Sequence, residues 1–417
     1  MCYNIAVSKK FFQKEVMQVF PFEVTFPTRI IFGVGELSRL PAEARTIGTK
    51  ALLVTGGTSA KVSGLLDRVT HSLHNASIPF TLFDRVEPNP RTSTVDAGAT
   101  LANEQGCDYV IALGGGSVMD AAKAIAVSAF SKRPIYDYMR GNPAGLWKEL
   151  QPIQEALPIV TIPTVAATGS EANHVSVLTH FATHEKSSIN GPGLYPKVAI
   201  LDPSLTYTVP PHVTAESCAD IFSHLFEAYL IGVSDAHVQD GFTESLIRQV
   251  VSYSTVAIEH PANEEARSTL LWASTLAISP FTLNGRGGGY PLHQLEHPLS
   301  GFYDISHGRG LAILSLPYFR QVILADRPER LARMGRECFG IAETDERLAA
   351  EQTIEAVSAW YQAMGITERL SDLGITRDSL MTMAEEAIRI GGRGADHITS
   401  SRPLYKEDVH AIYEECL

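Results

Sequence analysis

The sequence predicts an α/β N-terminal nucleotide-binding domain with a parallel β-sheet, followed by an all-α C-terminal metal-binding domain. Short apolar runs alternate with stretches of helical periodicity in the first half, which is typical of strand-helix repeats around a parallel sheet. Beyond about residue 205, β-branched runs become rare and long 3.6-residue apolar repeats take over. A chain of 417 residues also exceeds the size that one hydrophobic core usually supports.

The first half is expected to begin with an edge hairpin over residues 22–32, because Pro27 interrupts an extended pattern that Gly33 ends. A helix should open near Glu36. The apolar runs predicted as strands are 51–54, 80–83, 109–113, 159–162 and 198–201. The stretches predicted as helices between them are 65–73, 94–104 and 118–130. Such an order implies right-handed crossovers that cover both faces of the sheet.

The second half is expected to begin after Pro203, which interrupts regular structure, and Pro210-Pro211 adds a stiff connection. The predicted domains are residues 1–203 and 204–417. The clearest helices of the second domain are expected over 215–231 and 242–258.

Composition narrows the class of partner and the compartment. A net charge of -12, with no long Lys/Arg run, opposes a nucleic-acid or anionic-membrane partner and favours a small molecule. The five cysteines are odd in number and widely separated, so neither a disulfide framework nor a thiolate metal site is indicated. The N-terminus lacks an apolar signal core, and no run of 18 apolar residues occurs. We expect a cytoplasmic protein that does not enter a membrane.

Metal-competent side chains recur at helical spacing in the second half, as Asp220-x3-His224, His293-x3-His297 and then His307-Gly308. Residues four apart on a helix present their side chains on one face. Imidazoles together with a carboxylate suit Fe(II) or Zn(II), and the lack of thiolates argues against a structural zinc finger. The alternative for each pair is a solvated helix face or a hydrogen bond in the core.

A glycine-rich turn follows one predicted strand and precedes a predicted helix, where backbone N–H groups and the helix dipole favour an anion. Ligands bind at this end of parallel strands, so we expect the turn to hold a pyrophosphate. The alternative is that the glycines serve only the conformation of the turn. Its candidate contacts are Gly114, Gly115, Gly116 and Ser117. Asp120, one turn into the helix, is either an ordinary first-turn acid or a hydrogen-bond acceptor for ribose or nicotinamide.

Two further turns are candidates for nucleotide contacts. The loop over 161–171 is rich in hydroxyls, with Thr161, Thr164 and Thr168, although a polar turn capped by Thr168 or Ser170 explains it equally. The first strand ends in a turn whose candidate contacts are Gly56, Gly57, Thr58, Ser59 and Lys61. This turn has hydroxyls and a cation and no acid, which favours NADP(H) over NAD(H). Lys61 can also be a plain surface lysine.

Taken together, these motifs resemble the iron-containing (group III) alcohol dehydrogenases. The resemblance rests on GGGSVMD at 114–120, PTVAATGSE at 163–171, LDP at 201–203, Asp220-x3-His224 and HQLEHPLSGFYDISHG at 293–308. It spans the chain from about Phe22 to the end and implies the fold shared with dehydroquinate synthase. The spacing from His224 to His293 and the run EPNP at 87–90 look most like the branch of NADPH-dependent butanol dehydrogenases and aldehyde reductases.

The resemblance also implies roles for single residues. Its metal ligands match Asp220, His224, His293 and His307, and its proton-relaying histidine matches His297. Its cofactor contacts match Asn89, Gly115, Gly116, Ser117, Asp120, Thr164, Thr168 and Lys186. Gly56 stands where NAD-preferring members have an aspartate. Val165 and Ala167 depart from the usual PTTAGTGSE loop, and the first twenty residues have no counterpart.

The expected activity is hydride transfer between NADPH and a short-chain aldehyde or primary alcohol. The metal would polarise the substrate oxygen while the protein orients the nicotinamide. Size and family indicate a homodimer. The alternatives are a glycerol or polyol dehydrogenase of related architecture, or a metal-dependent enzyme without redox chemistry, such as a cyclase or hydrolase.

Overall fold

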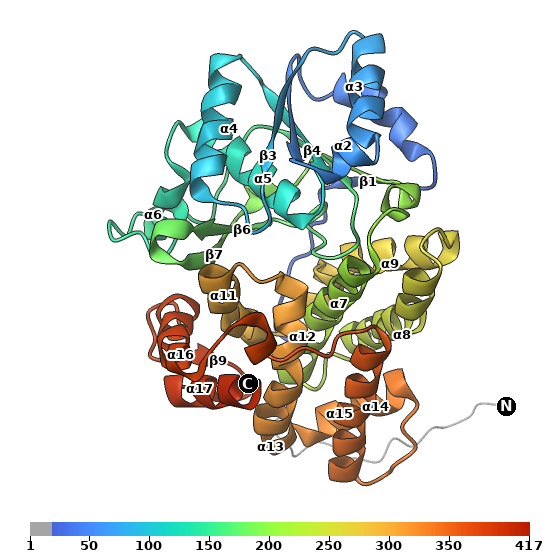
Figure 1. Cartoon of the computed structure of the whole chain (residues 1–417), viewed down its shortest axis with the longest axis vertical. Coiled ribbons are helices and arrows are strands. Elements are labelled where there is room, and N and C mark those ends of the chain that lie inside the picture. The colour runs from blue at the N-terminus through green and yellow to red at the C-terminus, as the bar shows by residue number, and fades with distance from the viewer. Residues whose placement is uncertain (1–18) are drawn as a thin grey trace, which may run out of the picture.

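A computed structural model describes residues 19–417 of the chain and confirms the predicted fold class. A six-stranded parallel sheet with helices on both faces lies above a body of helices (Figure 1). The strand order is β1-β8-β5-β4-β2-β3. The strands are β1 (Arg29–Phe32), β2 (Ala51–Gly56), β3 (Phe80–Val86), β4 (Tyr109–Gly114), β5 (Ile159–Pro163) and β8 (Val198–Leu201).

The central strands are buried on both faces because helices cover the sheet from each side. The side chains of β4 alternate between two apolar clusters, with Val110 and Ala112 in one and Ile111 and Leu113 in the other. Such strands have continuous apolar sequences, which is why the sequence predicted β2, β4, β5 and β8. The edge strand β3, which is only partly buried, was predicted as well. The helices of this half are α1 (Leu40–Ala44), α2 (Ser59–Val62), α3 (Leu65–Asn75), α4 (Thr92–Glu104), α5 (Gly116–Ser131) and α6 (Trp147–Leu150).

The predicted edge hairpin over residues 22–32 is wrong. Strand β1 begins only at Arg29 and pairs in parallel with β8, which follows it by more than a hundred residues. The extended segment before Pro27 crosses instead to the helical half, where the N–H of Phe20 donates to the carbonyl of Gly285. The local pattern indicated extended backbone correctly, but the partner of that backbone lies far away in the sequence.

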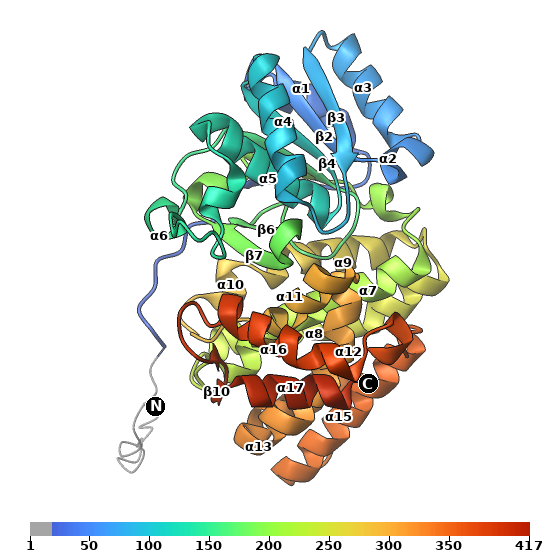
Figure 2. The ribbon, with the colours of Figure 1, turned by 60° about the vertical axis from the view of Figure 1, so that its left-hand side comes forward.

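A hairpin that the sequence did not reveal projects from the sheet towards the helices. It consists of β6 (Val175–His180) and β7 (Glu185–Asn190), paired antiparallel. Strand β7 contacts α11 (Pro291–Tyr303) and α16 (Arg377–Gly391), and Figure 2 shows the hairpin above these helices. Its strands, VSVLTH and EKSSIN, contain no continuous apolar run, so they lacked the signal of the other strands. The hairpin brings Lys186 to the helical half.

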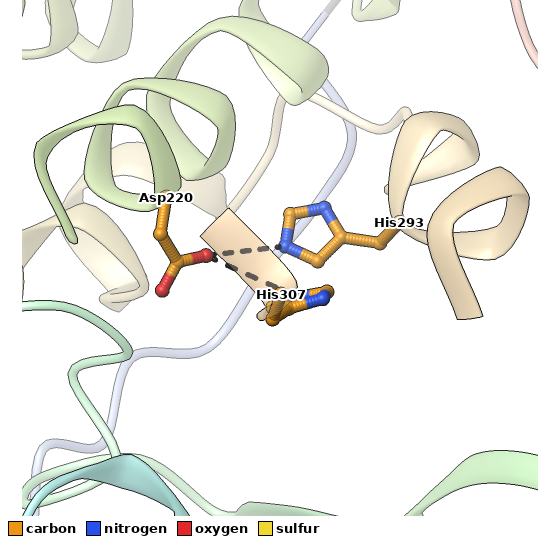
Figure 3. Close-up of side chains that lie close together, drawn as sticks. All are labelled: Asp220, His293 and His307. Carbon is orange, nitrogen blue, oxygen red and sulfur yellow. Dashed lines mark ion pairs between the residues drawn. The ribbon is translucent and has the colours of Figure 1, made fainter. Parts of the chain in front are cut away.

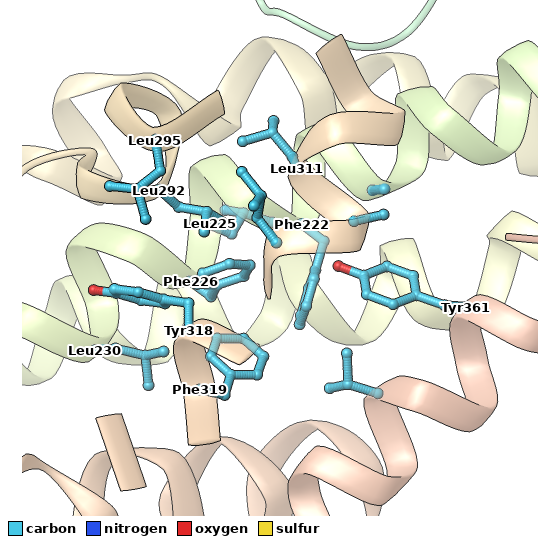
Figure 4. Packing of buried hydrophobic residues seen from close by; sticks show 14 of the residues in the cluster. Phe222, Leu225, Phe226, Leu230, Leu292, Leu295, Leu311, Tyr318, Phe319 and Tyr361 are labelled. Carbon is cyan, nitrogen blue, oxygen red and sulfur yellow. The ribbon is translucent and has the colours of Figure 1, made fainter. Parts of the chain in front are cut away.

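The helical half is organised around α7 (Pro211–Ile231). Every residue of α7 from Thr214 to Leu230 is buried, and Phe222 and Phe226 pack in its aromatic core (Figure 4). The other helices are α8 (His237–Glu259), α9 (Glu264–Ala277), α10 (Pro280–Leu283), α12 (His307–Tyr318), α13 (Leu324–Asp326), α14 (Pro328–Phe339), α15 (Glu346–Ala363) and α17 (Lys406–Glu415). Two short strands, β9 (Ile398–Thr399) and β10 (Pro403–Leu404), pair near the C-terminus.

Two conclusions follow from the helices. A helix that is buried all round must satisfy its polar side chains inside the protein, so the polar residues of α7 need partners there. Within residues 19–417, no helix combines the length and apolar character needed to cross a bilayer.

The division of the chain after residue 203 remains our proposal; the last strand of the sheet ends at Leu201 and α7 begins at Pro211.

Gly308 allows α12 to lie directly against α7. A Cβ atom at this position would lie 2.0 Å from the carbonyl oxygen of Glu216 on α7. The obstacle is backbone, so a larger side chain cannot be accommodated by a rotamer change. The glycine after His307 is therefore required by helix packing.

We predict that Gly308→Ala lowers the free energy of unfolding by about 1–3 kcal/mol, because α12 must move away from α7. Urea titration measures the change. Gly241→Ala is the matched control, since Gly241 lies in α8 with no neighbouring atom within 4 Å of the added methyl group. That control should gain up to about 1 kcal/mol from helix propensity. Equal stability of Gly308→Ala and the wild type would contradict the packing argument.

Candidate metal and cofactor site

Side chains from three helices converge around Oδ1 of Asp220. Asp220 from α7, His293 from α11 and His307 from α12 point towards one another in Figure 3. The Nε2 atoms of His293 and His307 lie 3.8 Å and 3.9 Å from Oδ1 of Asp220. The Nε2 atom of His224 lies 3.6 Å from the same oxygen. The structure therefore brings together all four side chains of the predicted ligand set.

Helix geometry produces this convergence. Asp220 and His224 are four residues apart on α7 and share one face. Asp304, in the left-handed region at φ 53°, ends α11 and turns the chain, so that α12 begins at His307. The ten positions after His297, up to and including His307, thus hold the last turns of α11, the reversal and the first residue of α12. The reversal returns His307 to the side of His293.

The polar atoms at this point suit a divalent cation. Asp220 is 3% exposed, and neither its Oδ1 nor Nε2 of His293 has a hydrogen-bond partner within the described part of the chain. Buried acceptors without donors are rare because each costs about 1–3 kcal/mol. One carboxylate oxygen and several imidazole nitrogens are ligands that Fe(II) and Zn(II) accept. The residues therefore fit a bound metal ion.

Burial controls the protonation of these ligands. It raises the pKa of Asp220 to about 7 and lowers the pKa of His307 to about 4. Burial also holds the pKa of His224 well below its ordinary value. His224 and His307 are therefore neutral imidazoles at neutral pH, the form that binds a metal.

Two buried carboxylates, which were not among the predicted site residues, are hydrogen-bonded to the Nδ1 atoms of His293 and His307. Glu227 accepts a hydrogen bond from Nδ1 of His293, and Glu296 accepts one from Nδ1 of His307. The helical spacing of these two glutamates relative to the ligand candidates could have indicated them in the sequence. Glu227 lies three residues after His224 on α7, and Glu296 lies three residues after His293 on α11, so each shares a face with a ligand candidate.

His297 lies one turn after His293 and points into an adjoining cavity. Its ring centroid is 6.0 Å from that of His307, and its Nδ1 is buried without a hydrogen-bond partner among the described residues. Burial lowers the pKa of His297 well below its ordinary value. The cavity is lined by His184, Lys186, Gln294, His297, Pro298, Glu386, Ala387, Ile390 and Gly391.

The predicted glycine turn lies at the carboxyl end of β4, and α5 begins at Gly116. A Cβ atom at Gly116 would lie 2.5 Å from the methyl group of Thr168, so the two predicted loops touch each other. At Gly115 the nearest atom, on Val165, is 3.5 Å away, which is an ordinary contact. Gly116 is therefore needed for loop packing, whereas the backbone around Gly115 and Ser117 is the part that remains suited to an anion.

Two of the predicted cofactor residues, Asp120 and Thr161, form hydrogen bonds with other parts of the protein. The carboxylate of Asp120 accepts hydrogen bonds from the Ser170 hydroxyl, at 2.6 Å, and the Val177 N–H, at 2.9 Å. The Thr161 hydroxyl is buried and donates to the carbonyl of Glu171. These contacts connect the helix, the hydroxyl-rich loop and the hairpin. The remaining loop residue, Thr164, donates its N–H to the carbonyl of Gly114.

Asn89 and Lys186 lie where the two halves of the chain meet. The Asn89 amide donates to Asp304, at 2.8 Å, in the turn before His307. Lys186 donates to Oδ1 of Asn89, at 3.1 Å, and its Nζ lies 3.4 Å from Nδ1 of His307. Both predicted cofactor residues are thus close to the metal-ligand candidates.

An acid on the neighbouring strand, which was not among the predicted site residues, lies beside the turn after β2. Lys61 forms an ion pair with Asp84 of β3, with 2.5 Å between Nζ and Oδ2. Asp84 is distant in sequence, but β3 is the neighbour of β2 in the sheet, and its carbonyl at Asp84 lies 3.9 Å from a Cβ built on Gly57. The turn beside this ion pair, where β2 ends and α2 begins, contains the other predicted contacts, Gly56, Gly57, Thr58 and Ser59.

The chain matches known proteins over almost its whole length. The family described as "Iron-containing alcohol dehydrogenase" matches residues 27–203, and "Fe-containing alcohol dehydrogenase family, C-terminal" matches residues 214–417. The NADH-dependent butanol dehydrogenase A of Clostridium acetobutylicum is 37% identical, covering 94% of this chain and 99% of that protein. The NADPH-dependent aldehyde reductase of Escherichia coli is 29% identical, covering 94% and 98%. The crystal structure of NADH-dependent butanol dehydrogenase A from Thermotoga maritima superposes with a TM-score of 0.89 at 32% identity, covering 96% and 99%.

Proposed function

The chain belongs to the iron-containing alcohol dehydrogenase family and is an NAD(P)H-dependent oxidoreductase of alcohols and aldehydes, and we propose that it reduces short-chain aldehydes to primary alcohols. We propose that Asp220, His224, His293 and His307 hold one Fe(II) or Zn(II) ion. A single observation supports this set most strongly: the Nε2 atoms of the three histidines lie 3.6–3.9 Å from Oδ1 of Asp220. That oxygen and Nε2 of His293 are buried without a hydrogen-bond partner among the described residues.

A bound metal would supply a Lewis acid for the substrate oxygen, and NAD(P)H would supply the hydride. The chain itself has three tasks in this proposal. The N–H groups of Gly115, Gly116 and Ser117 at the start of α5 bind the pyrophosphate. The apolar surroundings of α7 exclude water from the metal ligands. His297 passes a proton between the substrate oxygen and the adjoining cavity.

We propose NADP(H) as the preferred cofactor. Gly56 leaves the end of β2 without a carboxylate, and Lys61 offers a cation for a 2'-phosphate. Asp84 acts in the opposite direction because it pairs with Lys61 and would repel a phosphate. The relative from Clostridium acetobutylicum is named for NADH and the one from Escherichia coli for NADPH, so both cofactors are used among the relatives.

We further propose that the protein is a cytoplasmic homodimer. Cys107, Cys218, Cys338 and Cys416 are unpaired and buried, which is compatible with a reducing compartment. Strand β1 is at the edge of the sheet, and an edge strand is a template for pairing with another chain.

Loss of one metal ligand should remove the metal and the activity together. We predict that His307→Ala protein, purified after loading with zinc or iron, retains neither metal nor aldehyde reduction, while NADPH still binds. Elemental analysis, NADPH oxidation and fluorescence titration measure the three properties. His212→Ala is the control, because His212 is exposed on the same helix, α7. Turnover by metal-free protein would contradict the proposal.

Replacement of His297 separates proton transfer from metal binding. We predict that His297→Ala retains the metal but reduces kcat about 10²-fold or more, the range for loss of a general acid-base group. His297→Gln can donate and accept hydrogen bonds but cannot relay a proton, so its kcat should stay equally low. A rate restored by Gln would show that His297 only orients a neighbour.

Removal of single charges near the β2 turn tests the cofactor proposal. Lys61→Met should lower kcat/KM for NADPH roughly 5–10-fold, and Asp84→Asn should raise it, because each change removes about 1 kcal/mol of interaction with a 2'-phosphate. Values for NADH should change little in both variants. The proposal of NADP(H) preference fails if the wild type uses NADH as efficiently as NADPH.

A further inference from the structure

Two buried glutamates determine which nitrogen each of two histidines presents. Glu227 and Glu296 are fully buried, and each accepts a hydrogen bond from Nδ1 of a histidine. A proton on Nδ1 leaves the lone pair of a neutral imidazole on Nε2. Nε2 is also the atom that faces Oδ1 of Asp220 in both His293 and His307.

We propose that Glu227 and Glu296 are positioning residues that fix the tautomer and the ring orientation of His293 and His307 towards a single divalent cation. This inference rests on the proposed function, because it requires that a metal binds between Asp220 and the histidines. Carboxylates that orient ligating histidines in this way are a general feature of metal sites.

Glu227 holds the first turn of α11 against α7. Its Oε1 accepts from the Ser223 hydroxyl, at 3.0 Å, and from His293. Its Oε2 accepts from the backbone N–H groups of Leu292, at 2.6 Å, and His293, at 3.4 Å. All four contacts are with donors, so both oxygens must be acceptors. A glutamine would place its NH₂ group against donors on one side.

Glu296 connects His307 to the nucleotide-binding half. Its Oε1 accepts from the Ser300 hydroxyl, and its Oε2 accepts from His307 and from Lys186, whose Nζ lies 3.4 Å away. Lys186 belongs to the β6–β7 hairpin, so a cation from the first half of the chain completes the environment of a ligand in the second half. Both oxygens of Glu296 again face donors only.

His224 has no such carboxylate, which makes the role of the two glutamates specific. Its Nδ1 is buried without a hydrogen-bond partner among the described residues. The ring is held by packing instead, stacked on His293 with 4.6 Å between centroids and in edge contact with Tyr290 at 6.0 Å. Displacement of His293 should therefore disturb His224 as well.

Metal titration of the full-length protein tests the inference. We predict that the dissociation constant for Zn²⁺, measured by competition with a chelator, rises about 10–100-fold in both Glu227→Gln and Glu296→Gln. The d–d absorption of the Co²⁺-loaded protein should change in the same variants. Glu227→Asp keeps an acceptor-only group and should recover part of the affinity. Glu244→Gln is the matched control: Glu244 is also buried, but its partners are Tyr229 and Arg333 rather than a histidine, so zinc affinity should be unchanged.

The tautomers of His293 and His307 can also be measured directly in the wild-type protein. This measurement does not require any variant to fold. Long-range ¹H–¹⁵N spectra of the zinc-loaded protein should show protonated Nδ1 for His293 and His307. Two results would overturn the positioning role: a protonated Nε2 on either ring, or unchanged zinc affinity in both Gln variants when they are folded. Neither result would affect the proposed function, provided that the wild type still shows metal-dependent activity. A wild type that binds no Zn²⁺ overturns the proposed function, and the positioning role falls with it.

Discussion

The arrangement of the helical half depends on the convergence of one carboxylate oxygen and three imidazole nitrogens inside an apolar core. Asp220 lies on α7, which is buried all round, and its Oδ1 and Nε2 of His293 lose water without gaining a hydrogen-bond partner among the described residues. Each such group costs about 1–3 kcal/mol. A divalent cation would offset that cost, which explains how a core this apolar tolerates polar side chains at its centre.

Contacts around this point keep the helices in register. Gly308 lets α12 approach α7, and Asp304 reverses the chain before His307. Asn89 and Lys186, from the first half of the chain, contact the same turn and the carboxylate behind His307. The nucleotide-binding half is therefore in direct contact with the metal-ligand candidates, and a cofactor on the first half would lie beside a metal on the second.

The parts of the structure that the sequence revealed are those with local signals. Apolar runs separated by helical periodicity indicated the parallel sheet, and the i,i+4 spacing of Asp220 and His224 indicated a shared face. Strand β1 and the Lys61–Asp84 pair were misread or missed because their partners are distant in sequence. The β6–β7 hairpin was missed because its strands lack a continuous apolar run. Glu227 and Glu296 have the right periodicity, but a buried glutamate cannot be distinguished from an exposed one before the packing is known.

The central claim is that Asp220, His224, His293 and His307 share one ion. Anomalous diffraction from crystals of the zinc-loaded protein, recorded on both sides of the zinc absorption edge, tests it most directly. We expect one strong anomalous peak about 2.0–2.2 Å from each Nε2 atom and from the Asp220 carboxylate. A peak elsewhere, or none with the three imidazoles turned away from one another, would contradict it.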